Sequence, residues 1–156
     1  AMVVRDVMHA DVEYVTTTDS VHHAAEVLLT CNEGALPVVD EHHRVVGLLS
    51  ETDLLALAIP SYIDAESDLS FLPRSVELPT LCSADLKGLT VGDVLRTDIL
   101  ALIEEDDPIV EAARIMVRQR VRRCPVVRDG KLVGVLSRRT LMDILVRPAV
   151  EGTDPA

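Results

Sequence analysis

Two short segments of the sequence carry side chains suited to hold a sugar diol or an anion at the start of a helix. The first contains Ser50 and Asp53; a carboxylate can accept two hydrogen bonds from a diol, and the first N–H groups of a helix can face an anion. The second keeps a serine, Ser137, but has Thr140 in place of the aspartate, and a hydroxyl is a weaker partner for a diol. The same spacing also lets a helix cap itself, so binding and capping are both open interpretations.

Other reactive side chains do not assemble into a catalytic or metal-binding set. Neither His22-His23 nor His42-His43 has a third ligand at a recognisable spacing. The three cysteines are odd in number and far apart, which disfavours a disulfide framework and a thiolate metal site. No nucleophile has a base fixed beside it, and no glycine-rich phosphate loop is present. We therefore expect a protein that is not an enzyme and that holds no metal and no cofactor.

The elements that position these segments belong to an internal repeat. The segment from 4 to 57 can be laid over the segment from 91 to 144 with a shift of 87 or 88 residues. Pro37-Val38-Val39 returns as Pro125-Val126-Val127, and Ser50 returns as Ser137. The two Ser-x-x-polar segments are therefore expected at equivalent places in two similar units.

The repeat also predicts the domain organisation. Each copy predicts the order strand, helix, strand, strand, helix, with Asp19 or Ser20 capping the first helix of one copy and Asp107 capping that of the other. About 55 residues are too few to bury a sheet face alone, so we predict an α/β (α+β) fold in which two repeats pack about a pseudo-twofold axis. We expect repeat 1 at 1–59, a connector at 60–88, repeat 2 at 89–148 and a tail at 149–156.

Composition excludes several classes of function. Hydrophobic residues make up 48% of the 156 residues, enough for a core, whereas aromatic residues make up 2% and offer little for base stacking. A formal net charge of −11 disfavours nucleic-acid binding, because phosphate affinity comes mostly from lysine and arginine. No apolar run reaches the roughly 18 residues of a membrane helix. We expect a cytoplasmic protein that binds neither nucleic acid nor membrane.

Three features together resemble a known family. They are the order of elements, the apolar-Pro steps at Leu36-Pro37 and Cys124-Pro125, and the segment from Gly47 to Asp53. In combination they are similar to the cystathionine-β-synthase (CBS) domain pair, also called the Bateman module. The resemblance covers nearly the whole chain outside the connector, with two tandem copies in register. It implies a stand-alone CBS-domain protein that is regulatory, and generally a homodimer.

The resemblance also implies where a ligand binds. In CBS pairs, adenosine ligands lie in clefts between the repeats, and the serine and aspartate after the glycine-containing strand hold the ribose. Carried over to this sequence, the family pattern implies Ser50 and Asp53 for the ribose, Arg122 and Arg123 for phosphate, Ile99, Leu100, Ala101, Leu102 and Pro125 for the adenine, and Thr16, Pro37, Ser137 and Thr140 for a second, weaker cleft.

Charge makes the two copies unequal. Residues 114–139 contain nine lysines and arginines and one aspartate, whereas residues 26–52 contain one arginine and five acidic residues. Arg122 and Arg123 directly precede the Cys124-Pro125 step, and a planar guanidinium suits phosphate because it donates hydrogen bonds in pairs. For most of the other arginines we expect a solvated surface, or pairing with the acidic repeat of a neighbouring subunit.

Two hypotheses of function follow. The first is a ligand sensor that binds AMP, ADP, ATP or S-adenosylmethionine between the repeats and signals to an unknown partner protein. The second is a structural interaction module whose clefts are degenerate and empty, with the basic and acidic repeats serving subunit pairing. The loss of the aspartate at Thr140 supports the second hypothesis.

Overall fold

The computed structural model describes residues 2–31, 34–59, 72, 74–75, 77–82, 84–95 and 101–147. Its elements follow the predicted repeat. The first copy contains β1 (Val15–Thr16), α1 (Val21–Cys31), β2 (Ala35–Val39), β3 (Val45–Ser50) and α2 (Glu51–Ala58), and the second contains β4 (Ile103–Glu104), α5 (Ile109–Gln119), β5 (Arg123–Arg128), β6 (Lys131–Ser137) and α6 (Arg138–Val146). Three short helices lie outside this pattern: η1 (Val4–Asp6), α3 (Leu78–Leu81) and α4 (Val91–Val94). The predicted tail and much of the predicted connector lie outside the described residues.

Each repeat forms a three-stranded sheet of the same topology. The strand orders are β1-β2-β3 and β4-β5-β6; the first pair of each sheet is parallel and the second is an antiparallel hairpin. Val38 lies opposite Gly47, and Val126 lies opposite Gly134, with a register shift directly after each of these pairs. The predicted mixed fold with two equivalent repeats is confirmed.

The helix starts show which polar side chains act as caps. Ser20 caps α1, since its Oγ accepts the His23 N–H at 3.0 Å. The prediction that Asp107 caps the other helix is wrong. Its carboxylate instead accepts the Glu104 N–H at 3.1 Å, which closes the turn after β4, and Pro108 occupies the N-cap of α5.

The segment at the start of each repeat packs on the core of the other repeat. Val4 is fully buried in the core of the second repeat, and its N–H donates to the Asp107 carbonyl at 3.0 Å. Val91 is fully buried in the core of the first repeat, and its N–H donates to the Asp19 carbonyl at 2.8 Å. The two repeats therefore share their cores by exchange of these short segments.

The two hairpins also join through their main chains. Arg44 and Lys131 form an antiparallel bridge; the Val45 N–H donates to the Gly130 carbonyl, and the Leu132 N–H donates to the His43 carbonyl, both at 3.1 Å. Val39, Val45, Val127 and Leu132 form a third apolar cluster at this junction.

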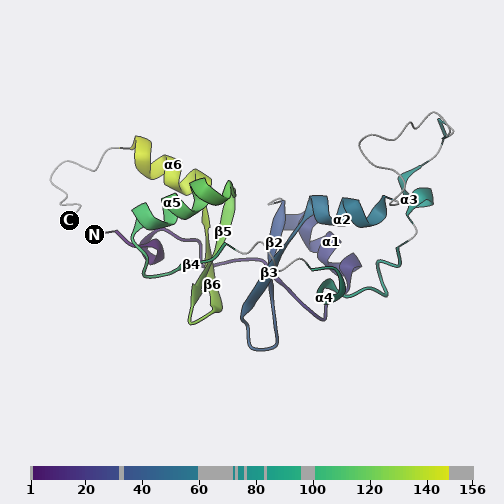
Figure 1. The fold of residues 1–156 in the computed structure, drawn as a ribbon, viewed down its shortest axis with the longest axis horizontal. Helices are drawn as coiled ribbons and strands as arrows, with labels where there is room; N and C mark the ends of the chain where they lie inside the picture. The colour runs from purple at the N-terminus through teal and green to yellow at the C-terminus, as the bar shows by residue number, and fades with distance from the viewer. Residues whose placement is uncertain are drawn as a thin grey trace.

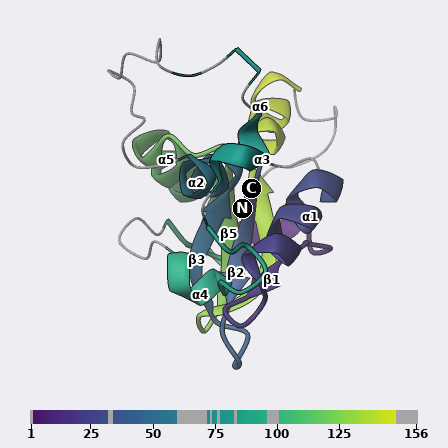
Figure 2. The same cartoon turned by 90° about the vertical axis from the view of Figure 1, so that its right-hand side faces the viewer.

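Helices α1, α2, α5 and α6 lie away from the hairpin turns (Figure 1). Figure 1 shows α5 and α6 beside one sheet and α1 and α2 beside the other, with both hairpin turns on the opposite side of the molecule. Figure 2 shows α2, α5 and α6 together at the end away from those turns. Among the described residues, no helix is long and apolar enough to cross a membrane.

Candidate ligand site between the two repeats

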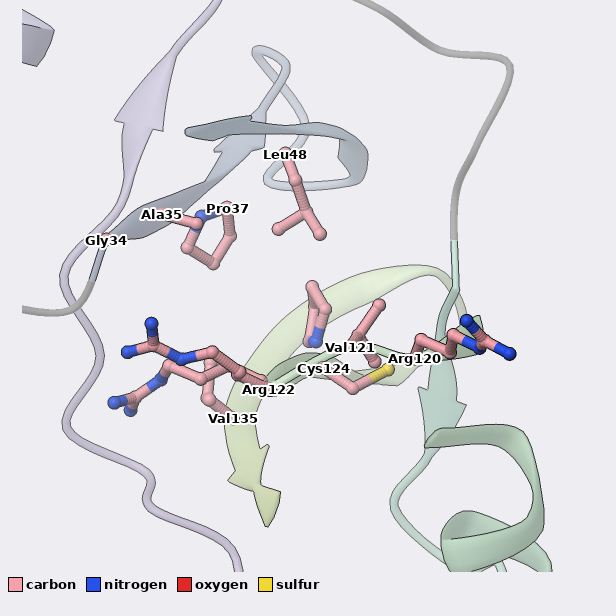
Figure 3. A pocket seen from close by; sticks show the side chains of 11 residues that line it. Gly34, Ala35, Pro37, Leu48, Arg120, Val121, Arg122, Cys124 and Val135 are labelled. Atoms are coloured by element: carbon pink, nitrogen blue, oxygen red, sulfur yellow. The ribbon is translucent and has the colours of Figure 1, made fainter. Parts of the chain in front are cut away.

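A cavity of about 250 Å³ lies between the two sheets (Figure 3). Both repeats contribute to its wall, the first through Gly34, Ala35, Pro37 and Leu48, and the second through Arg120, Val121, Arg122, Arg123, Cys124, Pro125 and Val135. Figure 3 shows Pro37 and Leu48 facing Val121 and Cys124 across the space. The Arg122 guanidinium lies toward one end of the cavity, and the Arg120 guanidinium lies toward the other.

The same backbone arrangement positions the wall in both repeats. The first N–H of each final helix donates to the residue before the central strand: Glu51 to the Gly34 carbonyl at 2.9 Å, and Arg138 to the Arg122 carbonyl at 2.8 Å. Gly34 needs a positive φ of 78°, which glycine adopts at little cost. In the second repeat Arg120 takes the left-handed conformation at the end of α5, with φ 55°.

The cavity combines apolar walls with cationic ends. Three arginines line it in a chain whose formal net charge is −11. Cys124 is completely buried, and its Sγ lies 3.1 Å from the Ala101 carbonyl oxygen, to which it donates. Burial raises the pKa of this thiol to about 12, so it stays protonated and acts as an apolar wall atom rather than a nucleophile.

Four of the predicted site residues line this cavity, namely Arg122, Arg123, Pro125 and Pro37. Ser50 lies next to it, because it is the strand partner of the lining residue Ala35. The Ser50 Oγ accepts the Asp53 N–H at 3.1 Å, and the Asp53 carboxylate accepts the Ser50 N–H at 3.0 Å. This pair therefore caps the helix. The other carboxylate oxygen of Asp53 is compatible with a binding role as well.

The family model of the CBS domain matches residues 4–59 and 91–147. The chain belongs to the CBS-domain family. The first match starts at Val4 and the second at Val91, so each matched unit includes the segment that packs on the other repeat. The prediction of a tandem CBS pair is confirmed.

Known CBS-domain proteins resemble this one over most of its length. It is 33% identical to CBSX1, a chloroplastic CBS domain-containing protein of Arabidopsis thaliana, over 82% of this chain and 56% of the relative, and so spans about half the length of that protein. A CBS-domain protein of unknown function from Kribbella flavida has a TM-score of 0.80 at 24% identity and covers 94% of this chain and 100% of its own. The crystal structure of CBSX2 in complex with AMP has a TM-score of 0.68 at 31% identity, and the match covers 94% of this chain and 97% of the CBSX2 chain.

Three further predicted residues that the structure describes, Ala101, Leu102 and Thr16, lie beyond the cavity wall. Ala101 is buried in the core of the second repeat, and Leu102 packs on the apolar cluster at the hairpin junction. Ile99 and Leu100 lie outside the described residues. Thr16 lies in β1, where its N–H donates to the Asp19 carboxylate at 2.8 Å.

The Ser137–Thr140 pair, predicted for a second cleft, differs from the Ser50–Asp53 pair in its polar contacts. The Thr140 hydroxyl lies 2.9 Å from the Ser137 hydroxyl and 3.4 Å from His9 Nε2. His9 itself pairs with β6 through two main-chain hydrogen bonds to Val135. The threonine that replaces the aspartate therefore contacts protein groups on both sides.

Sequence reasoning missed several residues of the site. Gly34 and Ala35 stand 88 residues before Arg122 and Arg123, so the repeat itself contained the signal that they share the cavity. Nothing in the sequence indicated that Arg120 lines the cavity. It does so from a left-handed conformation at the end of α5, which is uncommon for a residue other than glycine. His9 was found only through the fold, which brings it to Thr140 across 131 residues of sequence.

Proposed function

We propose that this CBS-domain protein is a non-catalytic regulatory module that binds an adenine nucleotide in the cavity between its repeats. The observation that carries the proposal is the lining of one inter-repeat cavity by Arg120, Arg122 and Arg123 in an acidic protein. In this proposal the protein is a cytoplasmic homodimer that signals the bound state to a separate partner protein.

The chemistry of the cavity favours a phosphorylated ligand. Guanidinium groups donate paired, charge-assisted hydrogen bonds to phosphate, and the apolar surface of Pro37, Leu48 and Val121 suits the flat faces of a base. The volume of about 250 Å³ lies near the small end of ligand pockets, which commonly start at roughly 300 Å³. S-adenosylmethionine carries a sulfonium cation, which the three arginines would repel. We therefore rank AMP, ADP and ATP above it.

A related structure supports the class of ligand. CBSX2, which is 31% identical to this chain and shares its fold, was crystallised in complex with AMP. The ribose end of the proposed site is Ser50 and Asp53, because Ser50 pairs with Ala35 in the cavity wall. Ala101, Leu102, Ile99 and Leu100 remain proposed contacts of the adenine. Pro37, predicted for the second cleft, lines the first cavity instead, and Thr16, Ser137 and Thr140 remain a proposed second cleft of lower affinity.

One observation favours the alternative of a structural module. The helices carry large apolar side chains that are widely exposed, including Leu29 at 83% and Val110 at 81%. Such side chains suit contact with another protein surface. A dimer with empty clefts would use these faces without any ligand.

A thermal-shift series with AMP, ADP, ATP, S-adenosylmethionine and NAD separates the two functions. A ligand present at a hundred times its dissociation constant stabilises the folded state by about 2.7 kcal/mol, so we expect a clear rise in Tm with at least one adenine nucleotide. The absence of a shift with all five compounds would support the structural module and overturn the sensor.

The arginines are tested on the same samples. Replacement of Arg122 and Arg123 by alanine removes two charge-assisted contacts, and we expect about a hundredfold loss of affinity for ATP or ADP. The matched control is Arg74→Ala with Arg147→Ala, which removes the same charge from exposed positions outside the cavity wall. Equal losses in the two variants would show that net charge, rather than the cavity, binds the nucleotide.

A further inference from the structure

The cavity between the repeats shares part of its wall with a second hollow in the second repeat. This second hollow is an apolar groove of about 680 Å³ between α5 and α6, and its lining residues include Met116, Leu141 and Leu145. Arg120 and Val121 line both the groove and the ligand cavity. The short segment that follows α5 therefore has the ligand cavity on one side and the groove on the other.

This segment is bound to the last turn of α5 through its main chain. The Arg120 N–H donates to the Val117 carbonyl, and the Val121 N–H donates to the Met116 carbonyl, both at 3.3 Å. Both bonds are longer than the common range of about 2.7–3.2 Å. Arg120 closes the turn in the left-handed conformation, which is unfavourable for a residue with a Cβ atom. We therefore expect the last turn of α5 to open more easily than the rest of the helix.

A further main-chain bond joins the ligand cavity to α6. The Arg122 carbonyl accepts the N–H of Arg138, which is the first residue of α6 and lines the groove. The equivalent bond of the first repeat runs from Glu51 to Gly34. Gly34 has no side chain with which to hold a ligand, whereas Arg122 has a guanidinium. Only in the second repeat does this bond connect a ligand-holding side chain to a helix.

We propose that a nucleotide in the cavity stabilises the last turn of α5 and the first turn of α6 through residues 120–122, and so fixes the shape of the groove. The Arg120 and Arg122 guanidiniums lie at opposite ends of the cavity (Figure 3), so a nucleotide that fills it contacts both. Restriction of these two residues strengthens the main-chain bonds to both helices. Binding and helix closure then favour each other by the same factor. The inference rests on the proposed function, because it requires a ligand in this cavity.

Hydrogen exchange followed by NMR measures the closure of the two helix ends. With saturating ATP, the amides of residues 117–121 and 141–144 should exchange about fivefold more slowly than in the free protein. Saturation is confirmed for each variant by its thermal shift, and the ATP concentration is raised where affinity is lower.

The bond to α6 is removed by Arg138→Pro. Proline is well tolerated as the first residue of a helix, and Ser137 has the extended conformation that the residue before proline prefers. The variant therefore keeps the helix but lacks the N–H that donates to Arg122. We expect the protection of residues 141–144 by ATP to fall below twofold. The matched control is Arg138→Ala, which loses the same side chain, keeps the N–H and should retain the fivefold protection. Equal protection in the two variants would overturn the role of this bond.

The connection to α5 is tested by Arg120→Asn. Asparagine tolerates the left-handed conformation but has no guanidinium, so ATP should no longer protect residues 117–121 and should still protect residues 141–144. The matched control is Arg118→Asn, which removes the same charge from an exposed position that lines neither the cavity nor the groove. Loss of protection in the control as well would contradict the assignment to Arg120.

The outcomes keep the two proposals apart. A wild-type protein that shows a thermal shift with ATP but no slower exchange at either helix end would overturn the connection and leave the ligand site standing. The absence of a thermal shift with any adenine nucleotide would overturn the ligand site, and the connection with it.

Discussion

The two repeats use the same backbone to present opposite chemistry at one cavity. At the start of the central strand, repeat 1 has Gly34 and Ala35 where repeat 2 has Arg122 and Arg123, although an equivalent N–H of the final helix bonds to each segment, at 2.9 and 2.8 Å. At the start of the final helix, repeat 1 has Asp53 where repeat 2 has Thr140. A duplicated scaffold thus offers two equivalent half-sites that can diverge separately; in the function we propose, one holds a sugar and the other holds phosphate.

The largest difference between the repeats is expected in the effect of glycine substitutions on stability, at the two places where the segments after Val4 and Val91 contact the hairpins. A Cβ at Gly134 would lie 2.7 Å from Met8 Sδ and 2.8 Å from the His9 carbonyl oxygen, whereas a Cβ at Gly47 would meet only the end of the Leu95 side chain, at 2.8 Å. A flexible leucine can rotate, but a strand-paired carbonyl cannot. We expect Gly134→Ala to lower the free energy of unfolding by about 1–3 kcal/mol and Gly47→Ala to lower it by less, as measured by urea denaturation.

Two variants control this pair. Met8→Ala in the Gly134→Ala background relieves only the contact with sulfur, so most of the loss should remain. Leu95→Ala in the Gly47→Ala background should recover part of the loss. Equal costs for the two glycine variants would show that the exchanged segments are held alike in both repeats.

The next largest effect concerns the two polar pairs at the helix starts. Asp53→Asn keeps a side-chain acceptor for the cap but removes the charge, so we expect nearly unchanged Tm and about a tenfold loss of nucleotide affinity. Thr140→Val should change affinity little, because the Thr140 hydroxyl already contacts Ser137 and His9. Isothermal titration with ADP measures both variants. Equal losses would mean that the two clefts are equivalent and that the comparison is wrong.

A smaller effect is expected from an ion pair found in the second repeat. The Arg128 guanidinium donates two hydrogen bonds to Glu105, whose side chain is 6% exposed, and it lowers the pKa of that carboxyl below its ordinary value of 4.5. A lowered folded pKa means that the pair stabilises the fold above pH 4.5 and that this contribution disappears as the pH falls through the folded pKa. Thr17 and Asp40 occupy the equivalent positions of the first repeat.

Denaturation between pH 3 and 7 tests this pair. Glu105→Gln should lower stability at pH 7 and flatten the dependence of stability on pH in the acidic range. Glu111→Gln is the matched control, because the Glu111 side chain is paired with Arg114 but is 41% exposed. A control that changes the profile as much as Glu105→Gln would contradict a special role for the buried Glu105 carboxylate.

The repeat made much of the fold predictable. Identical residues at a shift of 87 or 88 positions indicated two equivalent units, and Pro37 and Pro125 marked the central strands that now line the cavity. The arginines before Pro125 were also found, because their concentration is visible in the sequence. A repeat and a concentration of one residue type can both be read from the sequence without knowing which distant segments are in contact.

Other parts of the site could not be predicted, because they depend on contacts between distant segments. The pairing of His9 with β6 and its approach to Thr140 arise only when the first segment crosses to the second repeat. The predicted cap of α5 was wrong for a related reason. The Asp107 carboxylate could accept a hydrogen bond either from the start of α5 or from the turn after β4, and it accepts the Glu104 N–H in that turn. Sequence patterns do not rank such alternatives.

The exchange of Val4 and Val91 between the cores has a consequence for the order in which the protein forms during synthesis. When residue 59 leaves the ribosome, the first repeat still lacks Val91, which emerges 32 residues later. The segment around Val4 stays without its partners for even longer, because some of them lie in β6, which is the last strand to emerge. At typical elongation rates the N-terminal segment stays unpaired for on the order of ten seconds. The translated unit that can fold is therefore the pair, and neither repeat has a complete core by itself.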